Sequence, residues 1–147
     1  MALRISTIEW ERIRRHGEET YPHECCGVLL GEIDADGAKR VKAIVRCDNR
    51  RLDSPHNRYS IDPRELVRIQ REARGRDLDI VGFYHSHPEH PARWSQTDLA
   101  EAHWFSCSYV ITSVVKGKAD RTNSFELAGS DEGDKKLLDE EIVLLSG

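Results

Sequence analysis

The chain has 147 residues, of which 38% are hydrophobic and 33% are charged, and its formal net charge at pH 7 is −4. This length predicts one domain, residues 1–147, with a hydrophobic core of its own. The acidic balance argues against nonspecific nucleic-acid binding, which needs a basic face. No apolar stretch approaches the roughly 18 residues of a spanning helix, and Met1–Arg15 lacks the apolar run of a signal peptide. We therefore expect a cytoplasmic protein without nucleic-acid or membrane partners.

The N-terminal part of the chain predicts a strand, a helix and a β-hairpin in that order. Leu3–Ser6 suits a short strand, and Thr7–Thr20 suits a helix with acidic residues in its first turn. The continuous apolar run Cys25–Leu30 is typical of a buried strand. Turn residues at Asp34–Gly37 and the alternation of apolar and polar residues along Arg40–Arg46 indicate the returning strand.

The middle of the chain predicts a polar loop followed by a second helix and a buried strand. Asn49–Asn57 is polar, and Tyr59–Ile61 suits a short strand. Asp62 is a suitable N-cap for a helix over Pro63–Arg74, because proline is favoured at the first helical position. Asp79–His87 is rich in apolar residues and predicts a strand that is buried on both faces.

The remaining segments complete an α/β fold. Ser95–Trp104 suits a third helix, Ser108–Val115 and Ser124–Leu127 suit strands, and Ala128–Lys136 has the composition of an exposed connector. Ile142–Leu145 is ambiguous between a strand and a helix end; it closes the sheet or pairs with another copy as a homodimer. The sum predicts an antiparallel or mixed sheet flanked by about three helices.

The four cysteines do not indicate a metal site of their own. They are Cys25, Cys26, Cys47 and Cys107, and none forms a Cys-x-x-Cys pair. We expect buried, reduced thiols that act as small hydrophobic residues.

The segment His85-Ser86-His87-Pro88 is the first candidate for chemistry. On a strand, His85 and His87 point to one face, where two imidazoles can bind the same ion, while Ser86 points to the other face. Pro88 ends the strand, which places the pair at a sheet edge within reach of a substrate. A His-x-His pair by itself is more often structural.

Ser95 and Asp98 extend this candidate site. Three residues apart at a helix start, both side chains can project from the first turn, and Asp98 can supply an oxygen ligand. Two histidines and one carboxylate leave a fourth zinc position open for water, the pattern of a catalytic site, and zinc lowers the pKa of that water toward about 7. The alternative for Ser-x-x-Asp is a helix-capping pair.

Glu24 is the candidate proton carrier. It precedes the buried strand, and its carboxylate can take a proton from the water and deliver it to the leaving amine. Ser95 can then donate a hydrogen bond to the carbonyl oxygen as negative charge develops there. Taken alone, Glu24 is an ordinary surface acid, so the hypothesis rests on the combination of all these residues.

That combination resembles the JAMM (MPN-plus) metallopeptidase motif. The motif positions are Glu24, His85, His87, Ser95 and Asp98. The flanking segments Pro22–Gly31 and Gly82–Pro88 are also similar to the family's segments around its glutamate and its histidines. The resemblance covers residues 24–115 well and the C-terminal tail less well, and no motif position departs from the pattern.

The resemblance implies a JAB/MPN fold, a curved sheet between helices, with one zinc ion per chain. It implies a zinc-dependent peptidase or isopeptidase. The chain lacks the insertions with which eukaryotic relatives hold ubiquitin and looks like the compact bacterial branch, and residues 87–93 are especially similar to enzymes acting on ubiquitin-like sulfur-carrier proteins. Those enzymes trim residues after a terminal Gly-Gly or release a newly made cysteine. An extended Gly-Gly tail would lie along an exposed sheet edge.

Two alternatives stay open at this point. One is the same zinc chemistry on a different amide, such as a small-molecule conjugate. The other is a non-catalytic MPN-type scaffold, although relatives of that kind lose metal ligands, and all five motif positions are present here.

Several other residues near the motif are expected to be bystanders. We expect His90 in a solvated loop, and His23 and His103 directed away from the site. Trp94 either lines the entrance or packs, and Arg50–Arg51 is expected to be a solvated charge pair.

Overall fold

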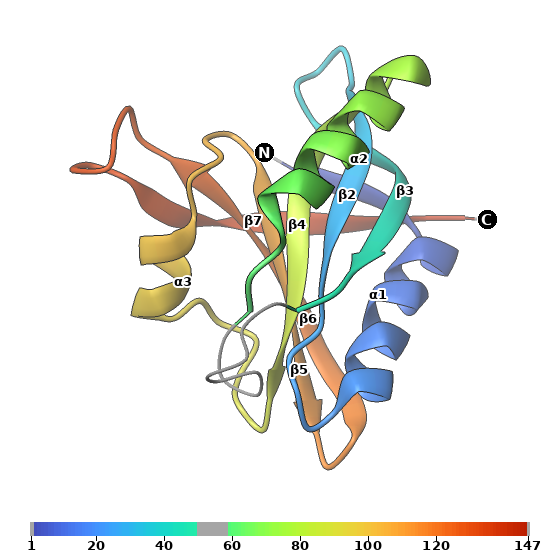
Figure 1. Ribbon diagram of the computed structural model, residues 1–147, viewed down its shortest axis with the longest axis vertical. Coiled ribbons are helices and arrows are strands. Elements are labelled where there is room, and N and C mark those ends of the chain that lie inside the picture. The colour runs from blue at the N-terminus through green and yellow to red at the C-terminus, as the bar shows by residue number, and fades with distance from the viewer. Residues whose placement is uncertain (1, 50–58, 147) are drawn as a thin grey trace.

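The structure, a computed structural model, describes residues 2–49 and 59–146 (Figure 1). The strands in these ranges are β1 (Ala2–Ser6), β2 (Cys26–Ile33), β3 (Lys39–Cys47), β4 (Asp79–Pro88), β5 (Ser108–Val115), β6 (Lys118–Ala128) and β7 (Lys136–Leu145). The helices are α1 (Thr7–Thr20), α2 (Pro63–Gly75) and α3 (Gln96–Glu101). Of the predicted loop Asn49–Asn57, only Asn49 is among the described residues. The rest, including Arg50 and Arg51, lies outside them.

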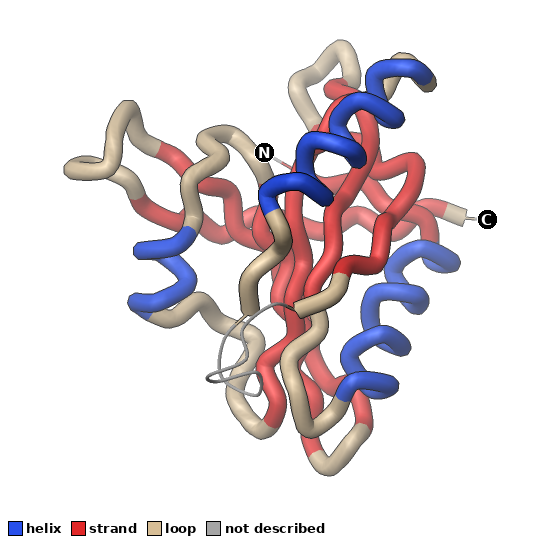
Figure 2. Tube along the Cα trace, viewed as in Figure 1, coloured by secondary structure: helices blue, strands red, loops and turns tan. Residues whose placement is uncertain are grey.

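The strands form one closed sheet in the order β1-β3-β2-β4-β5-β6-β7. β2 pairs antiparallel with β3 and β4, β4 pairs parallel with β5, and β5, β6 and β7 pair antiparallel in sequence. β1 closes the ring by pairing parallel with β7 from Ala2↔Glu141 to Ser6↔Leu145. The predicted mixed sheet with three helices is confirmed, and the helices lie on the outside of the strands (Figure 2). The ambiguous segment Ile142–Leu145 is the end of β7 and closes the sheet.

The third helix is shorter than the predicted Ser95–Trp104. It covers Gln96–Glu101, and Ala102 already has extended backbone with φ −85° and ψ 120°. Ala102 is 1% exposed, and Trp104 and Phe105 pack against the core next to it. The chain leaves the helix here because a continuing helix would turn these apolar side chains toward solvent. The irregular backbone lets them reach the core.

The sixth strand is longer than the predicted Ser124–Leu127, and one predicted strand is absent. β6 begins at Lys118 because Lys116 and Gly117, with φ of 52° and 82°, form the tight turn that reverses the chain after β5. Its first half is mostly polar and gave no hydrophobic signal. Tyr59–Ile61 has no strand pairing.

Helix α1 covers the back of the strand that carries the two motif histidines. Ser6 caps the helix by accepting a hydrogen bond from the Glu9 amide. A Cβ atom at Gly17 would lie 3.1 Å from Val114 and 3.2 Å from Ser86, so glycine permits a close helix-to-sheet contact. This contact holds the back of β4 and β5 in place.

The same face of β4 contains a buried aromatic residue in a hydrogen bond with a histidine. A Cβ atom at Gly27 would lie 2.1 Å from the ring of Tyr84, which therefore lies across the β2 backbone. The Tyr84 hydroxyl is 2.7 Å from Nδ1 of His16 on α1. Burial, reinforced by the positive charge of Arg46, lowers the pKa of His16 to about 4.

A buried polar cluster joins strands on the opposite side of the ring. Lys39 on β3 is 4% exposed and makes ion pairs with Glu126 at 2.5 Å and with Glu140 at 2.9 Å. Ser108 and Ser124 donate hydrogen bonds to the Glu140 carboxylate at 2.5 and 2.8 Å. Burial acts to lower the pKa of Lys39, but the two carboxylates outweigh it and raise that pKa. The cluster is therefore charged and fully paired, as a buried charge must be.

The cysteines are buried free thiols, as expected. Burial raises the pKa of Cys25 and of Cys47 to about 12 in each case, which keeps the unreactive thiol form. Among the described residues, no helix is long and apolar enough to cross a membrane.

We expect His16 to make stability depend on pH. Its pKa is about 4 in the folded chain and 6.5 as a free side chain, so the unfolded chain binds the extra proton between these values. The free energy of unfolding should fall by about 2 kcal/mol from this residue as pH decreases from about 6.5 toward 4.5. Urea denaturation at both pH values, with His16→Gln as the comparison, measures the effect. An unchanged pH dependence in the variant would contradict it.

Candidate metal centre

The two motif histidines lie on an interior strand, at the level where a neighbouring strand stops. His85 on β4 is paired with Cys26 on β2 and with Ile111 on β5. β2 begins at Cys26, so His87, two residues further along, is paired only with Ser113 on β5. The expected location at a sheet edge is therefore wrong, because β4 has neighbours on both sides. The centre is accessible because β4 extends past the start of β2.

Alternation along β4 places the histidines as predicted. The Nε2 atoms of His85 and His87 lie 3.1 Å apart on one face of the strand. Ser86 points to the other face, where its hydroxyl oxygen accepts a hydrogen bond from the Cys25 amide at 2.8 Å. Both imidazoles are buried, with His85 1% exposed and His87 8% exposed.

Asp98 joins the pair from the first turn of α3. Its Oδ1 is 3.2 Å from Nε2 of His85, and its Oδ2 is 3.2 Å from Nε2 of His87. Oδ2 also accepts a hydrogen bond from the Ser95 amide at 2.8 Å, while the Ser95 hydroxyl accepts one from the Asp98 amide at 3.1 Å. The capping interpretation is confirmed, and it is compatible with the ligand hypothesis, because the capping box holds the carboxylate against the histidines.

The three side chains fit a tetrahedral zinc ion. One donor atom from each residue lies within 4.8 Å of the other two. The shortest separations, which involve a different Asp98 oxygen for each histidine, are 3.1–3.2 Å, against the roughly 3.3 Å between ligands that zinc bonds of about 2.0–2.1 Å produce. His87 Nδ1 is 2.9 Å from the Pro91 carbonyl oxygen, to which it donates, so the lone pair of its Nε2 is free for a metal. Two imidazoles and one carboxylate are a donor set that suits zinc.

The surroundings of His85 favour a role of its imidazole as a metal ligand over a role as a general base. Burial lowers the pKa of His85, despite the opposing effect of Asp98, so its imidazole is neutral, the form that binds metals. Its Nδ1 is buried and has no hydrogen-bond partner among the described residues. Its ring stacks on Tyr59, with the ring centroids 4.5 Å apart and an interplanar angle of 25°. Tyr59 was not a predicted site residue, since only the tertiary fold brings it to His85.

Glu24 lies in the same cleft as His87 and Ser95. Glu24 is buried, with 5% of its surface exposed. Asn49 donates a hydrogen bond to its backbone carbonyl at 3.3 Å. Burial raises the pKa of Glu24 to about 8, with His87 opposing the shift and Asp98 adding to it. A carboxyl group with a pKa near neutrality can both accept and donate a proton.

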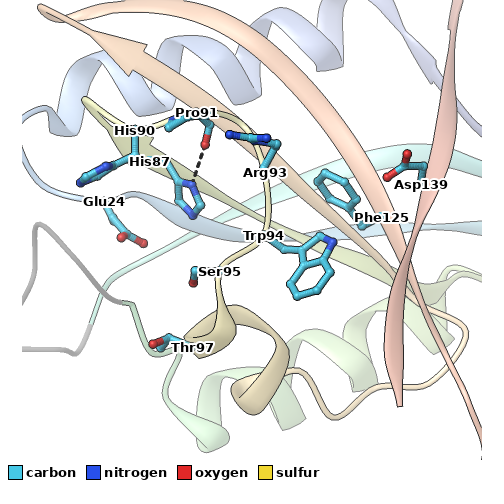
Figure 3. A pocket seen from close by; sticks show the side chains of 10 residues that line it. All are labelled: Glu24, His87, His90, Pro91, Arg93, Trp94, Ser95, Thr97, Phe125 and Asp139. Atoms are coloured by element: carbon cyan, nitrogen blue, oxygen red, sulfur yellow. Dashed lines mark hydrogen bonds between the residues drawn. The ribbon is translucent and has the colours of Figure 1, made fainter. Parts of the chain in front are cut away.

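The cleft extends from the centre toward β6 and β7 and has a volume of about 910 Å³. Figure 3 shows the side chains that line it: Glu24, His87, His90, Pro91, Arg93, Trp94, Ser95, Thr97, Phe125 and Asp139. The Glu24 carboxylate is directed toward Ser95 and His87 (Figure 3). Phe125 and Asp139 were missed, because β6 and β7 meet the cleft only through the fold. Arg93 lies in the segment 87–93 noted in the sequence but was not predicted as a site residue.

The remaining candidates divide between the cleft and the surface. His90 is exposed but lines the cleft, and Trp94 both lines it and packs against the core. His103 lies beyond the end of α3 and faces Glu132 at 2.8 Å, away from the two motif histidines. His23 is exposed.

The chain is similar to a described protein family, to proteins of known activity and to a solved structure. A family described as prokaryotic homologs of the JAB domain matches residues 8–128. Desampylase from Haloferax volcanii is 40% identical over 92 residues, and a probable TtuB-protein conjugate cleaving protease from Thermus thermophilus is 31% identical over 101 residues. These matches cover 63% and 69% of this chain, and each spans 63% of the relative's length. A solution structure of a Desulfitobacterium hafniense protein matches with a TM-score of 0.83 and 30% identity, over 99% of this chain and 94% of that chain.

We expect zinc to stabilise the protein through this centre. At a free zinc concentration about 100 times Kd, binding to the folded state adds about 2.7 kcal/mol and raises Tm by several degrees. His87→Ala or Asp98→Ala should abolish the rise, and a chelator should reverse it in the natural protein. The control is His90→Ala, which removes a cleft histidine outside the ligand set and should retain the rise. Thermal melting with and without zinc measures both, and an equal rise in all variants would contradict the assignment.

Tyr59 should hold the ring of His85 in its binding orientation. Tyr59→Leu removes the stacked ring and should weaken zinc binding about 10-fold, the scale of changes around metal ligands. Tyr59→Phe keeps the ring and should retain the affinity. Competition with a chelating dye measures the zinc affinity, and urea denaturation separates it from stability. Equal affinity in the natural chain and in the leucine variant would rule out this role.

Proposed function

Because the chain belongs to the family of prokaryotic homologues of the JAB domain, we propose that it is a zinc-dependent peptidase or isopeptidase. Its substrate is the amide bond after the C-terminal Gly-Gly of a ubiquitin-like sulfur-carrier protein. The observation that carries the proposal is the convergence of three side chains that could hold a metal ion, one of which lines the same cleft as a buried glutamate. The ligands are His85, His87 and Asp98, and the glutamate is Glu24.

The substrate class is supported by the relatives. One is a desampylase and another is described as cleaving TtuB-protein conjugates. The chain spans 63% of the length of each of these two proteins. A Gly-Gly tail also suits a buried centre, since glycine residues approach a metal without side chains that would clash.

The chemistry follows from the groups in the cleft. Zinc held by the three ligands supplies a Lewis acid that polarises a carbonyl group and lowers the pKa of water toward about 7. Glu24 accepts the proton of the attacking water and delivers it to the leaving amine, as its position and raised pKa allow. The Ser95 hydroxyl accepts from the Asp98 amide, so its own proton is free to be donated to the carbonyl oxygen of the substrate.

Glu24→Gln is the test of this proposal. Glutamine keeps the shape but cannot carry the proton, so cleavage should slow by about 10²–10⁴-fold, while zinc content and Tm stay unchanged. The assay is mass spectrometry of a sulfur carrier extended past its Gly-Gly. Glu72→Gln, an exposed residue on α2, is the matched control. Retained cleavage in the Glu24 variant would disprove its role, and near-zero zinc in the natural protein would favour the scaffold alternative.

A further inference from the structure

The part of the cleft beyond the metal ligands contains a cationic side chain without a partner. Arg93 is exposed and makes no hydrogen bond or ion pair with another residue in the described parts of the chain. In Figure 3 its guanidinium is directed toward His87 and Pro91, whereas Phe125 and Asp139 lie at the other end of the cleft. An arginine of this kind is available to a ligand.

The backbone around Arg93 is held in place on successive residues. The carbonyl oxygens of His90, Pro91 and Ala92 all have partners from the sheet. Ser113 donates to the first at 2.7 Å, His87 to the second at 2.9 Å, and Asn123 to the third at 3.0 Å. Ala92 is itself 3% exposed. The base of the Arg93 side chain is therefore positioned relative to the metal ligands, as a specificity residue requires.

The dimensions of the cleft suit a leaving group better than the glycine tail. Two glycine residues have no side chains and need little space, whereas the whole cleft that Arg93 lines together with Glu24 and His87 has a volume of about 910 Å³. A second, smaller cleft of about 330 Å³ begins at Tyr59, whose ring covers His85, and lies on the α2 side. The larger cleft, which Glu24 and His87 line, can take the group that carries the leaving amine, whereas none of the five motif residues lines the smaller one.

The chemistry of the leaving group then determines what Arg93 meets. If one residue follows Gly-Gly in a normal peptide bond, its carboxylate is two bonds from the scissile nitrogen. If the amine belongs to a lysine side chain, that position carries only the lysine methylene groups. A guanidinium binds a carboxylate through two parallel hydrogen bonds and gains nothing from methylene groups.

We propose that Arg93 binds the free α-carboxylate of a short leaving group and makes the enzyme prefer carriers extended by a normal peptide bond over lysine-linked conjugates. The proposal rests on the proposed function and adds the class of leaving group to it. Trp94, which follows Arg93 in the chain and lines the same cleft, covers the side chain of the released residue.

Matched substrates test this assignment. The carrier is prepared ending in Gly-Gly-Ala with a free carboxylate, in Gly-Gly-Ala carboxamide, and in Gly-Gly joined to a lysine side chain of a peptide. For the natural enzyme, kcat/KM should be highest for the free acid. Arg93→Gln should lower kcat/KM for the free acid about 10–100-fold, the scale of a lost charge-assisted contact, and change the other two by less than about 2-fold. Arg93→Lys should be intermediate.

Binding measured without turnover provides a second readout. In zinc-loaded Glu24→Gln protein, fluorescence anisotropy should show tighter binding of the free acid than of the carboxamide, and Arg93→Gln in that background should remove the difference. Arg71→Gln, on the exposed face of α2, is the control and should leave both readouts unchanged. If the natural enzyme cleaves acid and carboxamide equally, or Arg93→Gln slows all substrates equally, the role is overturned and the proposed function stands. If no substrate is cleaved or bound, both fail.

Discussion

The alternation of side chains along β4 is the constraint on which the candidate centre and its support both depend. A strand directs successive residues to opposite faces, so His85 and His87 share one face while Tyr84 and Ser86 share the other. A register shift of one residue would exchange the two pairs and destroy the centre. The register is secured on the back face, where the Tyr84 hydroxyl meets His16. Groups that take no part in the chemistry therefore determine where its ligands lie.

Asp98 shows how the centre is assembled before a metal arrives. Its carboxylate accepts the Ser95 amide, which fixes the side chain at the start of α3, and the same group approaches both imidazoles. Burial acts to raise the pKa of Asp98, but its close contacts with His85 and His87 outweigh it and keep that pKa well below its ordinary range. An ionised carboxylate is the form in which Asp98 binds a divalent cation. Helix capping and ligand orientation are thus one interaction.

The sequence predicted elements whose signals are local. Thr7–Thr20 and Ser108–Val115 have the predicted bounds, since Ser6 caps the first and the second is rich in apolar and β-branched residues. The five motif positions could be named because their types and spacing are specific, and four of them lie in or next to β4 and α3. The stacking of Tyr59 on His85 could not be predicted, because it depends on how the chain before α2 returns to β4. The closure of the sheet by β7 depends likewise on distant pairing.

The segment between β4 and α3 contacts a proposed metal ligand and carries the proposed specificity residue. The Pro91 carbonyl that accepts from His87 Nδ1 fixes the tautomer of a ligand, and it stands two residues before Arg93 in the same loop. A change in this loop that relocates Arg93 would therefore also disturb the hydrogen bond that keeps Nε2 of His87 free. Asn123 on β6 restrains the loop from the other side through Ala92. Because both restraints act on backbone carbonyls, the residue at position 93 can vary without moving the ligand. Under the proposed roles, a substitution at this position would change selectivity and leave the candidate ligands in place, whereas insertions in the loop would alter both together.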